Sequence, residues 1–279
     1  MQQDKVKVKI SGASSSMLGC LWSRAQLSRE YSSLFFDAKA VELVEQIDYT
    51  PDFSASDVPP FEDIMVNVFF SRKINQTGFG LFTLRAKQFD EKAKAYIAEH
   101  PRASVINIAA GLDTTFYRVD NGSVHWYDLD LPAVIEIRKQ LLPEPDRVTY
   151  IAKSFLDQSW CKDVNTENGV FMIAGGVLLY FEEAQVKRFF SLLADNLPDG
   201  EIVFDAPSRK IRRTGLIAPF KWTLRDANKI TKWDTRVKVI DQFPLFKNIP
   251  RDPAWSIDMR RFMDISERCR LTNIFHLRV

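Results

Sequence analysis

A turn of small residues is followed, a little under 20 residues later, by two aspartates that could bind a ligand. Ala109, Ala110 and Gly111 come directly after a short β-branched run, and Asp128 and Asp130 lie 17 and 19 residues beyond Gly111. An acid about 20 residues after such a turn accepts hydrogen bonds from ribose hydroxyls in adenosine-binding proteins. The pattern therefore predicts an adenosine site, although a purely structural turn between a strand and a helix remains the alternative.

The composition of the turn also restricts the ligand. Dinucleotide sites use several glycines, through which the backbone approaches a pyrophosphate at a helix N-terminus. Alanines occupy the first positions of this turn, and only Gly111 remains as glycine. We therefore expect a ligand without phosphate, such as S-adenosylmethionine (SAM), and not NAD.

Strands that alternate with helices must position these residues. Apolar runs bounded by turn residues predict strands at 104–109, 124–127, 148–152, 170–174 and 202–204. Apolar residues at helical spacing predict helices near 84–100, 132–142 and 182–196. This alternation indicates βαβ units in a parallel sheet, a Rossmann-like α/β fold whose ligands bind at the carboxyl ends of the strands.

The flanking segments are less regular. We predict a helical N-terminal extension at about 1–84 that covers the site, and a sheet domain at 85–279. A segment rich in Trp, Arg and Pro at about 206–255 is predicted to be an inserted cap, with a helical patch at 223–232 and a strand-like stretch at 237–240. Residues 271–279 alternate weakly, and we expect a final edge strand there.

Composition excludes several classes of protein. The 279 residues are 46% hydrophobic and 27% charged with a net charge of +2, which gives no sign of a surface that coats nucleic acid or membrane. The longest apolar run, 169–181, is shorter than the roughly 20 residues that cross a bilayer. Three scattered cysteines and three histidines, with no close pair, indicate reduced thiols and no metal site. We expect a cytoplasmic protein whose oligomeric state is open.

Several ordered motifs carry a family resemblance. They are Arg85 with Phe89 and Asp90, then 105–114 (VINIAAGLDT), 116–118 (FYR), 126–132 (WYDLDLP), 154–160 (SFLDQSW), 176–180 (GVLLY) and 197–205 (LPDGEIVFD). Arg24 and 37–40 (DAKA) match as well. Over about 20–205 the chain resembles the leucine carboxyl methyltransferase superfamily, which includes the tetracenomycin-type polyketide O-methyltransferases. The resemblance implies a class I SAM-dependent methyltransferase with a mostly parallel, seven-stranded sheet and helices on both faces.

By matching position, the resemblance also implies which residues hold SAM. Arg85 would bind the carboxylate of its methionine part, a task suited to a guanidinium, although a solvated helix charge is the usual fate of an arginine. Asp130 would hold the ribose, and Asp128 would be either its supporting partner or a strand-end charge. The other cofactor-binding candidates are Ala109, Gly111, Ser154, Phe155 and Gly175.

Two residues depart from the family pattern. Gly175 stands where many members have a glutamate, and Thr115 stands where an arginine is frequent. Together these departures indicate a divergent subgroup. They also keep open a non-catalytic module that binds SAM or another protein.

The function that we predict is methyl transfer to a carboxylate or hydroxyl of a small molecule, with carboxyl methylation of a protein C-terminus as an alternative. Tyr180 would line the site of transfer, unless it packs in the core under the cap. The basic residues Arg209, Arg212 and Arg213 would orient an acidic acceptor, unless they form a solvated basic face. No histidine falls in the predicted cap, so the sequence does not suggest a His-dependent phenol mechanism.

Overall fold

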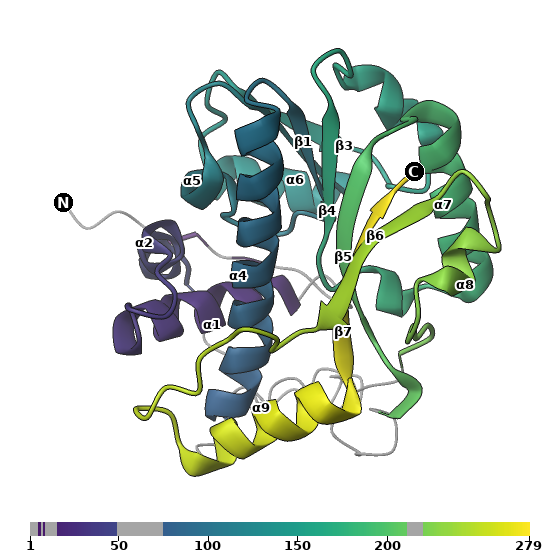
Figure 1. Ribbon diagram of the computed structural model, residues 1–279. Coiled ribbons are helices and arrows are strands. Elements are labelled where there is room, and N and C mark those ends of the chain that lie inside the picture. Colours follow the sequence, from purple (N-terminus) through teal and green to yellow (C-terminus); the bar gives the residue numbers. More distant parts are fainter. Residues whose placement is uncertain (1–4, 7, 9–15, 49–74, 211–219) are drawn as a thin grey trace, which may run out of the picture.

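The sheet at the centre of the molecule has seven strands in the order β3-β2-β1-β4-β5-β7-β6 (Figure 1). The computed structural model describes residues 5, 6, 8, 16–48, 75–210 and 220–279. The strands are β1 (Ser104–Ile108), β2 (His125–Asp130), β3 (Val148–Ala152), β4 (Val170–Ala174), β5 (Glu201–Pro207), β6 (Lys238–Pro244) and β7 (Thr272–Arg278). The first five pair in parallel, and β7 runs antiparallel to both β5 and β6. The predicted Rossmann-like α/β fold is confirmed.

The predicted position of the last strand in the sheet is wrong. We expected residues 271–279 to form an edge strand, but β7 lies between β5 and β6. Its first six residues are buried, including the polar Thr272, Asn273 and His276. These polar residues imitate the alternation of a half-exposed strand, although both faces of β7 are covered. The edge position belongs to β6, which is more exposed.

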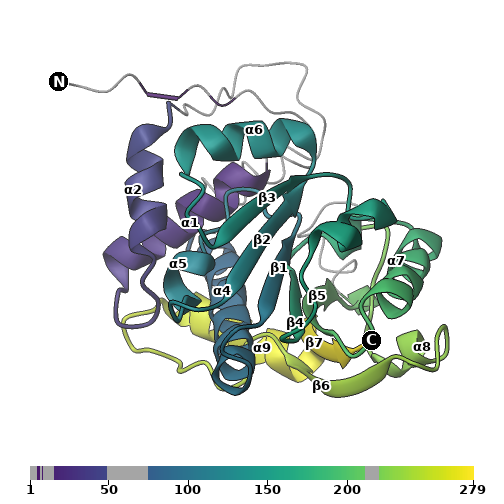
Figure 2. The same ribbon diagram turned by 90° about the horizontal axis from the view of Figure 1, so that it is seen from above.

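Helices cover both faces of the sheet (Figure 2). In the described part of the chain, those of four residues or more are α1 (Ser16–Glu30), α2 (Ala38–Gln46), α4 (Asn75–Glu99), α5 (Phe116–Val119), α6 (Pro132–Leu141), α7 (Glu183–Asn196), α8 (Asn228–Thr231) and α9 (Ile257–Cys269), with a six-residue 3-10 helix at Gln158–Asp163. The apolar sides of α7 and α8 pack on one face, and those of α4 and α9 pack on the other. A third apolar cluster joins α1 and α2 to α6.

Two boundaries drawn from the sequence differ from the observed elements. Helix α4 begins at Asn75, so the predicted division at 84/85 falls inside one continuous helix. The interval 206–255 contains β6, a full member of the sheet, and its helical patch is the single turn α8. None of the helices in the described ranges is long and apolar enough to cross a membrane.

Candidate cofactor site

The turn after β1 contacts the acid at the end of β2. Because the two strands pair in parallel with Ile108 opposite Leu129, both end at the same edge of the sheet. The backbone N–H of Gly111 donates to Oδ2 of Asp130 at 2.8 Å, and the N–H of Leu131 donates to Oδ1 at 2.7 Å. Burial raises the pKa of Asp130 above its ordinary value. The structure thus brings together two of the residues that the sequence singles out.

The backbone of this turn is left-handed at two residues. Gly111 has φ +50°, and Ala109 has φ +55°, a conformation that costs an alanine about 1–2 kcal/mol. A Cβ atom at Gly111 would lie 3.1 Å from Cβ of Met17, so helix α1 packs directly against the turn. Glycine at 111 therefore serves both the turn and the approach of the N-terminal extension.

Asp128 stabilises the turn through a buried arginine. It is fully buried and pairs with Arg138 of α6 at 2.6 Å, while Asn107 and the indole N–H of Trp126 donate to its other oxygen. Arg138 also donates to the carbonyl oxygens at Gly111 and Asp113, at 3.0 and 2.9 Å. Of the two readings open for Asp128, the structure favours that of a supporting partner. The sequence analysis missed Arg138, whose signal was a lone arginine on the apolar side of a helix.

Leu131 is a second residue that the sequence analysis missed. Its side chain is 49% exposed, although it follows Asp130 directly and lies between the buried strand β2 and helix α6, whose apolar side is buried. Pro132, the first residue of α6, holds the chain in its sharp turn at this point. Leu131 therefore presents an apolar surface beside the carboxylate of Asp130.

A cation and an acid meet at the ends of β4 and β5. Nη1 of Arg85, on α4, lies 3.4 Å from Oδ2 of Asp205, and Oδ1 of Asp205 accepts the N–H of Gly176 at 2.6 Å. Burial lowers the pKa of Arg85, but the charge of Asp205, followed by those of Cys20 and Tyr180, raises it above the ordinary value. A Cβ atom at Gly176 would lie 2.5 Å from Nη1 of Arg85. A side chain at 176 would displace the guanidinium from this position, and the left-handed φ of +68° also favours glycine.

The neighbouring Gly175 is enclosed by an aromatic ring. A Cβ atom there would lie 2.8 Å from Cε2 of Phe89, closer than such atoms approach in proteins. Phe89 is itself 4% exposed and packs in the core beneath α4. The ring of Phe89 thus leaves no space for a side chain at position 175, where many members of the family have a glutamate.

The remaining site candidates are distributed differently. Tyr180 ends a short 3-10 helix, Leu178–Tyr180, is half-buried, and has its ring centroid 6.1 Å from that of Phe220. The side chain of Phe155 lies in the core between Phe181 and Phe189, at 4.9 and 5.0 Å between ring centroids. Ser154 is half-buried, and its hydroxyl accepts the N–H of Leu156 at 3.3 Å.

The basic cluster after β5 is only partly described. Arg209 is exposed, whereas Arg212 and Arg213 lie outside the described residues. The aromatic Trp222 is 1% exposed and packs against Phe204, so it belongs to the core and does not line an open pocket.

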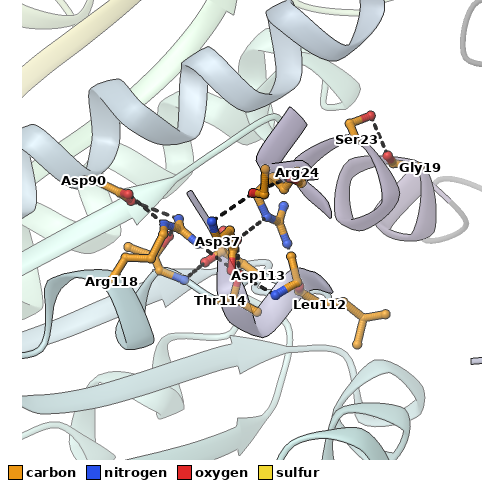
Figure 3. A network of polar contacts seen from close by, with 12 residues as sticks. Gly19, Ser23, Arg24, Asp37, Asp90, Leu112, Asp113, Thr114 and Arg118 are labelled. Carbon is orange, nitrogen blue, oxygen red and sulfur yellow. Dashed lines mark hydrogen bonds and ion pairs between the residues drawn. The ribbon is translucent and has the colours of Figure 1, made fainter. Parts of the chain in front are cut away.

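A buried charge network joins the N-terminal extension to the turn (Figure 3). Asp37 lies between Arg24 and Arg118 and accepts from them at 3.1 and 2.6 Å, and it also accepts the hydroxyl of Thr114 at 2.6 Å. Arg118 binds both oxygens of Asp90, and Arg24 donates to the carbonyl of Leu112 at 2.8 Å. The extension is therefore held on the turn by paired, buried charges.

This network also explains several of the matched motif residues. Thr115, the second departure, is 3% exposed and its hydroxyl accepts from Arg118 at 2.8 Å. Burial lowers the pKa of Arg118, but Asp90 and Asp37 raise it well above the ordinary value. Arg118 and Asp90 thus hold elements together around the site.

The chain matches a protein family and known proteins over more than half of its length. The leucine carboxyl methyltransferase family matches residues 18–194. The tetracenomycin polyketide synthesis O-methyltransferase TcmP of Streptomyces glaucescens is 31% identical over 227 residues, which cover 77% of this chain and 76% of that protein. The S-adenosyl-L-methionine-dependent methyltransferase dpfgK of Gibberella zeae is 27% identical over 219 residues, with 73% and 69% covered.

A solved structure supports the fold independently. A DUF574 family protein from Streptomyces avermitilis superposes with a TM-score of 0.58 at 13% identity, over 81% of this chain and 93% of that one. At this identity the likeness shows the fold alone. With the family match and the relatives above, the chain belongs to the leucine carboxyl methyltransferase family of SAM-dependent methyltransferases.

Proposed function

We propose that the protein transfers the methyl group of SAM to a carboxylate or hydroxyl oxygen of a small molecule. The observation that carries this is the order of groups along the carboxyl edge of the sheet. Strands β2, β1, β4 and β5 are consecutive neighbours, so Asp130, the Gly111 turn and the Arg85–Asp205 pair follow one another in that order. SAM has a matching order of chemical groups, since its ribose lies between the adenine at one end and the charged amino acid at the other.

The donor set also fits this cofactor. Asp130 offers carboxylate oxygens to ribose hydroxyls, and the exposed Leu131 offers an apolar surface to the adenine. Arg85 offers a guanidinium to the methionine carboxylate. When bound, SAM supplies an electrophilic methyl group on a sulfonium. The chain contributes alignment of the two reactants and exclusion of water.

The acceptor class is drawn from the relatives and from the chemistry of the flanking segments. TcmP is an O-methyltransferase of polyketide synthesis, and the chain spans three quarters of it. We assign the residues before helix α4 to a covering extension and those between strands β5 and β6 to a cap, with Tyr180 lining the transfer site. Arg209, Arg212 and Arg213 would orient an acidic acceptor, which needs no general base because a carboxylate is already ionised.

The setting that we propose is the cytoplasm, since Cys20, Cys161 and Cys269 are all free thiols. The net charge of +2 favours a small molecule over a nucleic acid as the partner.

Calorimetry with SAM, followed by mass spectrometry of candidate small molecules and peptides for added methyl groups, tests the function. We expect SAM to bind at tens of micromolar or tighter and a small molecule to gain a methyl group. Failure to bind SAM would overturn the enzyme assignment, and methylation of a peptide C-terminus alone would overturn the acceptor class.

The basic cluster is tested separately by reversing charge at Arg209, Arg212 and Arg213 together. We expect a higher KM for the acceptor with unchanged affinity for SAM. Arg102→Glu is the control, because Arg102 is exposed and lies two residues before β1, at the opposite end of the sheet. Unchanged acceptor kinetics in the triple variant would remove these arginines from the acceptor site.

A further inference from the structure

Asp205 is a buried acid that joins three elements at the candidate site. Its side chain is 4% exposed at the end of β5, and it contacts Arg85 of α4 and the backbone of Gly176 after β4. Burial of a carboxylate is costly unless charges and hydrogen bonds compensate it. Arg85 and the backbone N–H of Gly176 supply part of this compensation for Asp205.

The contacts of Asp205 leave part of its acceptor capacity unused. An ionised carboxylate accepts about four hydrogen bonds, and Asp205 accepts one at 2.6 Å from Gly176 and one at 3.4 Å from Arg85. The second is long for a charge-assisted bond, which is typically about 2.7–2.9 Å. The two opposite charges are thus adjacent but do not form a short hydrogen bond with each other.

The other acids near this edge are engaged elsewhere. Asp128 is fully buried against Arg138, and Asp130 accepts from the turn at the end of β2, two strands away from β4 in the sheet. Asp113 accepts the N–H of Thr115. In the described part of the chain, Asp205 is the carboxylate in contact with both Arg85 and the loop after β4.

We propose that Asp205 binds the α-ammonium of the methionine part of SAM, while Arg85 binds the neighbouring carboxylate. A zwitterionic amino acid needs one anion and one cation spaced as its own charges are, and Asp205 and Arg85 supply both from adjacent positions. The assignment rests on the proposed binding of SAM. The ammonium is then bound from β5, and the N–H of Gly176 keeps the carboxylate of Asp205 in place.

The wild-type protein tests this without any substitution. Its affinity is measured by calorimetry for S-adenosylhomocysteine and for the analogue in which hydrogen replaces the α-amino group. We expect the analogue to bind at least about tenfold more weakly, because a charge-assisted hydrogen bond is lost. Equal affinities would overturn the assignment of Asp205. Failure of both ligands to bind would overturn the proposed function itself.

The variant Asp205→Asn then separates binding from mere support of Arg85. The amide keeps the shape of the side chain but removes the charge, so we expect the preference for the amino ligand to fall from at least tenfold to nearly none. A variant that weakens both ligands equally and keeps the preference would show that Asp205 acts only through Arg85. That outcome, like an unchanged variant, would contradict the proposal.

Two controls accompany the variant. Binding of 5′-methylthioadenosine, which lacks the amino acid, should be unchanged in Asp205→Asn, because the adenosine end lies with Asp130. Glu201→Gln removes a carboxylate at the other end of the same strand and should leave the preference at its wild-type value.

Discussion

Arg138 of α6 and Asp128 of β2 form a buried ion pair, with 2.6 Å between Nη2 and Oδ2, directly beneath the turn that carries Gly111. The same guanidinium donates to the carbonyl oxygen of Gly111 at 3.0 Å. One arginine therefore joins a strand, a helix and the turn. The position of the turn depends on this pair as well as on its own backbone.

Replacement of Arg138 by alanine should lower the free energy of unfolding by about 3–5 kcal/mol, because it leaves the carboxylate of Asp128 buried without its partner. Urea denaturation measures the change. Arg29→Ala is the control, since Arg29 pairs with Glu45 on the surface and should change stability by less than about 1 kcal/mol. A loss below about 1 kcal/mol in the Arg138 variant would show that the pair does not support the fold.

Replacement of Asp37 by alanine should release the N-terminal extension. Asp37 is fully buried and pairs with both Arg24 and Arg118, so its loss leaves Arg24 without its ion pair and Arg118 with Asp90 alone, which should cost about 3–5 kcal/mol. Limited proteolysis should cut within 16–46 faster than in the wild type. In the control Glu45→Ala, an exposed acid of α2, the cleavage rate should be unchanged. Equal protection in both variants would contradict a role of the network in docking.

Replacement of Ala109 by glycine should stabilise the protein. The left-handed φ of +55° costs an alanine about 1–2 kcal/mol, which glycine would relieve. The greater entropy of glycine in the unfolded chain offsets about 0.5–1 kcal/mol of that relief. We expect a net gain of about 0.5–1 kcal/mol in thermal or urea unfolding. Ala110→Gly is the matched control, because Ala110 has no positive φ and the same change should destabilise. Destabilisation by Ala109→Gly would refute the strain.

The carboxylate of Glu201 should make stability depend on acid pH. Burial raises its pKa, but hydrogen bonds from His276 and Arg278 lower it, and the result lies below the ordinary value of 4.5. An acid with a lowered folded pKa contributes stability above its unfolded pKa and loses it as the pH falls through the folded pKa. Above about pH 5 the wild type should therefore exceed Glu201→Gln in unfolding free energy by a constant amount. This difference should shrink below about pH 4.5.

Denaturation series across this range check the prediction for Glu201. Glu45→Gln, at a side chain that is 70% exposed, should show no such change with pH. A Glu201 difference that grows on acidification would have the opposite sign to the one expected.

Replacement of Leu131 by serine should weaken binding of S-adenosylhomocysteine by roughly three- to tenfold, because about half of a leucine surface would no longer be covered by the adenine. Stability should change little, since the side chain is 49% exposed. Ile240→Ser, at a residue 44% exposed on the edge strand β6, is the matched control and should bind normally. Calorimetry decides, and unaltered affinity in Leu131→Ser would remove Leu131 from the site.

Much of the local structure was predictable from the sequence. Strands β3 and β4 have the predicted bounds, and the turn after β1 lies next to the acid that ends β2, as its spacing indicated. These features depend on short apolar runs, turn residues and the rule that parallel strands end at a common edge, all of which can be read within some 30 residues.

The partners of the charged residues were decided only by the tertiary structure. Arg85 meets Asp205 across 120 residues, and Arg118 meets Asp37 across 81, at distances along the chain where no pattern specifies pairing. The position of β7 inside the sheet is of the same kind, because its buried Thr272, Asn273 and His276 look like surface residues until β5 and β6 enclose them. The sequence alone determined where the parallel strands lie, since that is set by neighbours along the chain, although the predicted ends of β2 and β5 fall three residues short of the observed ones. Which buried charge compensates which depends on desolvation and packing between distant elements, and only the folded chain brings those elements together.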